Sequence, residues 1–144
     1  MSGTFRHGDP RDSPTSERPM TSAVTNLRIL VRLCGLILII LGIIFWTGHA
    51  LGLISVHMVV GLLFAVVLWV LAFLGAKAHV GAGFVTLVAV WALIMVVFGA
   101  VQVRLMPGSA HWVIQVLHLL IGIAALGMGD QLGTRLSRAA YQAS

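Results

Sequence analysis

Long apolar stretches separated by short polar segments dominate the chain from residue 28 onward. Residues 33–76, 78–103 and 105–129 contain no Asp, Glu, Lys or Arg. A helix of about 20 apolar residues crosses the hydrocarbon core of a bilayer. The three stretches therefore predict two, one and one membrane-spanning helices, which we expect at residues 28–47, 53–75, 82–103 and 110–128.

Polar or glycine-containing segments separate these expected helices. Thr47-Gly48-His49-Ala50 divides the first apolar stretch, and residues 76–83 contain Lys77 and two glycines. Pro107 and Ser109 favour a turn followed by the start of a helix. The pattern predicts an all-α integral membrane protein, built as a bundle of four transmembrane helices.

Composition supports a membrane location and suggests how the chain is divided. Of 144 residues, 59% are hydrophobic and 9% are charged, and the mean hydropathy is +1.03. Soluble enzyme classes are excluded by these values. Residues 1–24, rich in Ser, Thr, Pro and charge, are expected to form a disordered tail. Residues 25–130 then form the transmembrane domain, and residues 131–144 form a short C-terminal tail.

The distribution of basic residues predicts an orientation. With four spans, both termini and residues 76–83 share one side and carry every Lys and Arg except Arg104. Because short loops rich in Lys and Arg stay in the cytoplasm, both termini are expected to be cytoplasmic, in a bacterial cell membrane. The isoelectric point of about 11.2 reflects this asymmetry, so a nucleic-acid partner is not needed to explain it.

Two histidines occupy similar positions within the apolar sequence, as His57-x-x-x-Gly61 and His118-x-x-x-Gly122. Residues 42–45 can also be overlaid on residues 99–102, so the four helices are expected to be two parallel two-helix repeats. In an up-and-down bundle, the second and fourth helices lie diagonally opposite and run in the same direction. His57 and His118 are therefore expected to face each other at similar depth.

A histidine pair in this position is suited to the axial ligation of haem iron. Histidine is costly to bury in a membrane and usually has a function there, and neutral imidazoles are suitable haem ligands. Gly61 and Gly122, one turn from the histidines, would leave room for a flat macrocycle. We expect His57 and His118 to be the metal ligands of haem b. The alternatives are another metal or proton-linked role, and histidines that only contact carbonyls or headgroups.

Further polar residues and two glycine patterns extend these expectations. His49, His111 and Arg104 lie on the side opposite the termini, where they could bind haem propionates or simply occupy the membrane interface. The Gly-x-x-x-Gly patterns at residues 48–52 and 129–133 match a helix-association motif, so a homodimer is a candidate assembly.

The residues around the histidine pair resemble one four-helix half of the haem A synthase family. The resemblance spans residues 28–128 and rests on His57-x-x-x-Gly61, Phe98-Gly99-Ala100-Val101, Pro107 and His118-Leu119. It implies haem-ligating histidines on the second and fourth helices. Cytochrome b561-like membrane proteins share this general arrangement.

One feature of the family is missing. Its catalytic halves carry a glutamate shortly before the histidine of the second helix, where this chain has Leu53-Ile54-Ser55-Val56. No acidic residue occurs between Glu17 and Asp130. The resemblance therefore implies haem binding rather than haem synthesis.

These patterns predict a small membrane b-type cytochrome that transfers electrons or handles haem, surrounded by lipid and served by a redox partner protein. With both axial positions occupied, the chain is not expected to be an enzyme by itself. The alternatives are a cofactor-free accessory or assembly protein and a small transporter. The lack of carboxylates within the spans disfavours a proton-coupled transporter.

Overall fold

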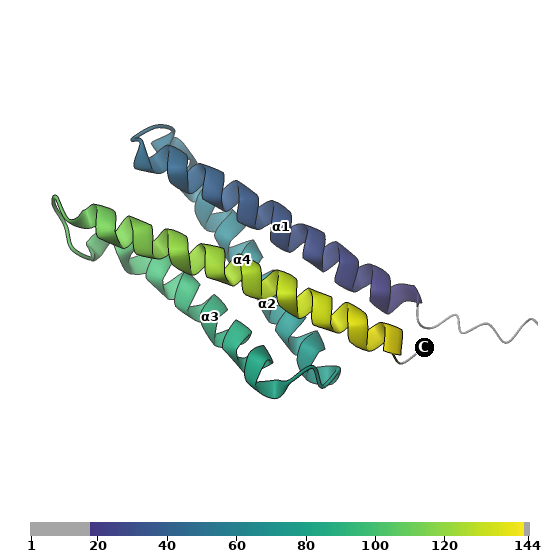
Figure 1. The fold of residues 1–144 in the computed structure, drawn as a ribbon. Coiled ribbons are helices and arrows are strands. Elements are labelled where there is room, and N and C mark those ends of the chain that lie inside the picture. Colours follow the sequence, from purple (N-terminus) through teal and green to yellow (C-terminus); the bar gives the residue numbers. More distant parts are fainter. Residues whose placement is uncertain (1–17, 143–144) are drawn as a thin grey trace, which may run out of the picture.

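The computed structural model describes residues 18–142, which form four long helices joined by short connections (Figure 1). The α-helices are α1 (Arg18–Trp46), α2 (Ile54–Lys77), α3 (Ala82–Val101) and α4 (His111–Gln142). Two short 3-10 helices, η1 (Leu51–Leu53) and η2 (Gln102–Arg104), lie in the α1–α2 and α3–α4 connections. No strand occurs between residues 18 and 142.

The four expected helices are confirmed, and each is long and apolar enough to cross a membrane. Two boundaries differ from expectation. α1 begins at Arg18, so residues 18–24, expected within the disordered tail, are helical. α4 continues to Gln142, beyond the expected end at residue 128 and through most of the expected C-terminal tail. Hydropathy detects only the apolar part of a helix, and α4 continues through Gly129 and Gly133 without a break. Residues 1–17, the rest of the expected N-terminal tail, lie outside the described part.

The helices form a closed ring in which α1 contacts α2 and α4, and α3 contacts the same two helices. α2 and α4 also contact each other across the ring, so they occupy the diagonal positions expected from the sequence. The start of α1, the end of α4 and the α2–α3 connection lie at one end, which we call the terminal end (Figure 1). The distal end contains residues 47–53 and 102–110.

Buried side chains are concentrated toward the terminal end. Val31 of α1, Leu68 and Leu71 of α2, Val88 of α3 and Leu132 of α4 are at most 1% exposed. They belong to one continuous apolar cluster contributed by all four helices. Burial of this cluster is the main interaction between the helices in this half of the molecule.

Residues 36–63 and 96–120, which we call the distal half, are packed much less tightly. Ile114 is the only buried residue among them. α1 and α4 also diverge toward the distal end (Figure 1). The bundle is thus tightly packed at the terminal end and looser at the distal end.

Glycines of α4 allow close contact between helices near the terminal end. A Cβ at Gly129 would lie 2.5 Å from Leu68 Cδ2 and 3.1 Å from Val31 Cγ1, and one at Gly133 would collide with Arg28. The Gly-x-x-x-Gly pattern at residues 129–133 therefore packs helices within one chain. It no longer supports the candidate homodimer. The pattern at residues 48–52 falls in the α1–α2 connection, with nothing within 4 Å of either glycine's added Cβ.

Polar contacts join neighbouring helices in addition to the apolar cluster. Trp69 Nε1 of α2 donates to the Ala89 carbonyl of α3 at 3.1 Å. Trp91 Nε1 of α3 donates to the Ile121 carbonyl of α4 at 3.0 Å. Arg32 of α1 approaches Asp130 of α4, with its Nη2 2.9 Å from Oδ1. These contacts join α2 to α3, α3 to α4, and α4 to α1.

Candidate functional site

His57 and His118 lie together in the distal half. His57 is in the first turn of α2, and His118 is two turns into α4. Their ring centroids are 6.4 Å apart and the ring planes make an angle of 51°. Because α2 and α4 run in the same direction and touch across the ring of helices, the bundle brings both imidazoles to one depth.

Each imidazole has a phenylalanine neighbour from an adjacent helix. Phe45 of α1 meets His57 edge-on, with centroids 5.5 Å apart. Phe98 of α3 stacks on His118, with centroids 6.0 Å apart and an angle of 12° between planes. All four helices therefore contribute one ring to the site, and each phenylalanine restricts the orientation of one histidine.

The histidine rings carry unsatisfied nitrogen atoms. Nδ1 of His57 and Nδ1 of His118 are both buried and lack a hydrogen-bond partner. Burying a polar atom without a partner costs about 1–3 kcal/mol. Since buried polar atoms are usually paired, these two Nδ1 atoms mark the histidine pair as the candidate site.

Glycines next to the histidines have different surroundings. A Cβ at Gly99 would lie 3.2 Å from His118 Cε1, so this glycine allows the His118 ring to rest against α3. A Cβ at Gly122 would have nothing within 4 Å, whereas one at Gly61 would lie 3.8 Å from Leu38 Cδ2 of α1. Open space therefore lies beside Gly122, and Gly61 lies against α1.

Two imidazoles are a small donor set for a bare metal ion. No group of three or more His, Cys, Asp or Glu side chains that could hold a metal occurs in the described part of the chain. A haem brings its own equatorial nitrogens and needs only two axial ligands. The 6.4 Å between centroids is the distance that a group held by both rings would have to span.

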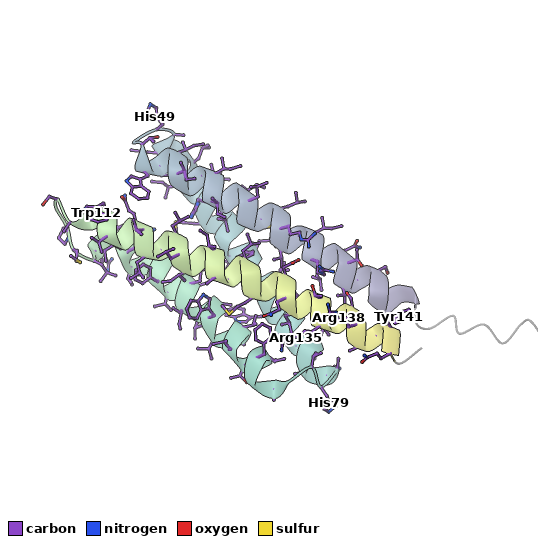
Figure 2. The ribbon with its side chains drawn as sticks, in the orientation of Figure 1. His49, His79, Trp112, Arg135, Arg138 and Tyr141 are labelled. Carbon is purple, nitrogen blue, oxygen red and sulfur yellow. The ribbon has the colours of Figure 1, made fainter. Side chains whose placement is uncertain are left out.

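The other predicted site residues are not in contact with the pair. His111 Nδ1 lies 3.2 Å from the Leu105 carbonyl, so its ring is tied to the α3–α4 connection. Arg104 is exposed at the same end. His49 lies at the tip of the distal end and contacts Thr47, and His79 is at the opposite end of the molecule (Figure 2).

The sequence patterns did not assign Phe45, Phe98 or Gly99 to the site. The sequence does indicate the depth of the two phenylalanines in the bundle. Residues of two antiparallel neighbouring helices lie side by side when they are equally far from the connection between the helices. Phe45 and His57 are equidistant from residue 51, and Phe98 and His118 are equidistant from residue 108. This signal places the residues of each pair at similar depth, and the ring contacts themselves come from the structure.

Comparisons with known proteins add no assignment: no protein-family model, curated protein or solved structure matches the chain.

Proposed function

We propose that the chain is a small b-type cytochrome of a bacterial cell membrane, with one haem held between α2 and α4 by His57 and His118. The observation that carries the proposal is the close imidazole pair, at 6.4 Å between centroids with both Nδ1 atoms buried and unpartnered. Loose packing around the pair and open space beside Gly122 support the same assignment.

Haem would supply one-electron redox chemistry, and the chain's residues would set its conditions. His57 and His118 would both ligate the haem iron, and no position would then remain for oxygen or a substrate. Phe45 and Phe98 contact the imidazole rings, and the apolar side chains around the pair would influence the reduction potential. These features suit electron transfer, or haem handling for a redox partner protein, rather than oxygenase chemistry.

Charge supports an orientation with both termini in the cytoplasm. The terminal end carries the basic residues of the described part except Arg104: Arg18, Arg28, Arg32, Lys77, Arg135 and Arg138. Arg104 lies at the distal end, together with His111. This orientation places the histidine pair in the outer half of the membrane, where Arg104 and the free edge of His111 are available to haem propionates.

The haem proposal is tested by absorption spectroscopy of the protein purified in detergent after expression with sufficient haem. We expect a Soret band, with sharp α and β bands on dithionite reduction, as given by a low-spin iron with two axial histidines. His57→Ala and His118→Ala should each remove the low-spin spectrum. His49→Ala is the matched control, because His49 is exposed and lies at the tip of the distal end.

Two results would contradict the proposal. One is a purified, folded protein with no Soret band, which would favour a cofactor-free accessory protein. The other is a haem spectrum that survives both His57→Ala and His118→Ala, since the haem would then be bound elsewhere.

A further inference from the structure

A groove runs between α1 and α4 near the terminal end, away from the histidine pair. It is a shallow groove, open to the surface, with a volume of about 430 Å³. It is lined by Arg32, Leu36, Ile39, Leu126, Gly127 and Asp130. Arg32 and Asp130 therefore form a charged part of the groove, and the other residues form an apolar part.

The charged part of the groove consists of Arg32 and Asp130, and Arg28 lies beside Asp130 outside the lining. Asp130 Oδ1 lies 2.9 Å from Arg32 Nη2 and 3.4 Å from Arg28 Nη2, so one carboxylate is shared by two guanidinium groups. The Arg32 side chain is 60% exposed, which leaves part of its donor fork available. An anionic oxygen is the complement of this arrangement.

The apolar part of the groove has a firm wall and free space. A Cβ at Gly35 of α1 would lie 2.7 Å from Leu126 Cδ1, so Leu126 is seated directly against α1. A Cβ at Gly127 would meet nothing within 4 Å. The groove can therefore accept a flexible hydrocarbon chain alongside Leu36 and Ile39.

The depth of the charged pair matches a lipid headgroup. A Cβ at Gly133 would meet Arg28, and one at Gly75 near the end of α2 would lie 3.1 Å from Leu132 Cδ1. Arg28 thus lies near the level of the α2–α3 connection, and Arg32 lies four residues, about 6 Å, further into the bundle. Basic side chains between helices at this level bind acidic phospholipid headgroups in membrane proteins.

We propose that this groove binds one anionic phospholipid of the leaflet at the terminal end, with its phosphate on Arg32 and one acyl chain along Leu36, Ile39 and Gly127. The proposal rests on the proposed membrane insertion and does not depend on haem. The bound lipid would cover the α1–α4 seam where Asp130 joins the two helices.

Native mass spectrometry of the full chain tests this site. Protein in detergent is mixed with phosphatidylglycerol or with phosphatidylcholine of the same acyl chains, and the lipid retained per chain is measured. We expect one phosphatidylglycerol to be retained in preference to phosphatidylcholine. Arg32→Gln should lower that retention about fivefold, the effect of losing roughly 1 kcal/mol of headgroup attraction.

Two further variants separate the groove from general surface charge. Arg138→Gln removes the same charge from an exposed position of α4 that does not line the groove, and it should retain the lipid. Gly127→Leu fills the apolar part without changing charge, and it should lose the lipid. Circular dichroism checks that each variant keeps its helix content.

Three results would overturn the lipid site: equal retention of the two lipids, equal loss in Arg32→Gln and Arg138→Gln, or full retention in Gly127→Leu. A dimer that excludes lipid would overturn it in favour of a second copy of the chain. Failure of membrane insertion is distinguishable, because the protein would then be released from membranes by alkaline carbonate. The haem spectrum reports separately on the histidine pair.

Discussion

Gly99 of α3 is the residue on which the position of His118 depends most directly. Its missing side chain lets the imidazole lie where an added Cβ would be only 3.2 Å from Cε1. Phe98, the preceding residue, stacks on the same ring. Two consecutive residues of α3 thus restrain His118 from different sides, and the ring can move little without moving the helix.

Gly99→Ala should reduce haem retention and broaden the low-spin spectrum, because the added methyl group displaces the His118 ring. The same substitution should not weaken the helix, since alanine stabilises a helix interior by about 0.5–1 kcal/mol relative to glycine. Haem content per protein and thermal unfolding of the haem-free form measure the two effects separately.

The control for this substitution is Gly42→Ala in α1, where an added Cβ has nothing within 4 Å. Gly42 is also the position that the repeat pairs with Gly99. Equal haem loss in the two variants would show that Gly99 does not position His118 specifically.

At the scale of the helices, the sequence predicted the number, order and approximate centres of the spans, because runs without charge report directly on a nonpolar environment. It did not predict the extensions of α1 and α4. The residues after Asp130 are mostly polar, but Leu132 and Leu136 lie on one face and are buried. This four-residue spacing, in step with Gly129 and Gly133, was the available signal for a helix continuing beyond the apolar run.

The site was predictable to a similar extent. The pairing of His57 with His118 followed from equivalent positions on diagonal helices, and the structure brings the two rings together. The expectation that Gly61 and Gly122 leave room beside the histidines stays a prediction, and Leu38 of α1 lies 3.8 Å from an added Cβ at Gly61. Such contacts depend on the rotation and separation of helices, which periodicity alone does not determine.

Gly129→Val should destabilise the bundle by about 1–3 kcal/mol, because its side chain would collide with Leu68 and Val31 and force α4 away from α1 and α2. Gly127→Val is the matched control, two residues earlier in the same helix, where an added Cβ meets nothing within 4 Å. Unfolding in SDS, followed by circular dichroism, compares the two variants. Equal stability would show that close contact at Gly129 contributes nothing to the fold.

For the whole molecule, the proposed orientation can be tested with single cysteines. The native Cys34 is buried at 5% exposure and is first replaced by alanine. Lys77→Cys should then react with a membrane-impermeant maleimide only after the cells are permeabilised, whereas Arg104→Cys should react in intact cells. The reverse pattern would invert the orientation and place the histidine pair in the inner half of the membrane.

Uneven packing along the bundle also affects how the protein opens. The free energy of local opening follows the density of apolar contacts, so helix ends in the distal half should separate far more often than those in the terminal half. Amide hydrogens near residues 57 and 118 should exchange with solvent before those near residues 68 and 132. A flat cofactor could therefore enter between α2 and α4 through local fraying at the distal end, while the opposite end keeps the four helices in register.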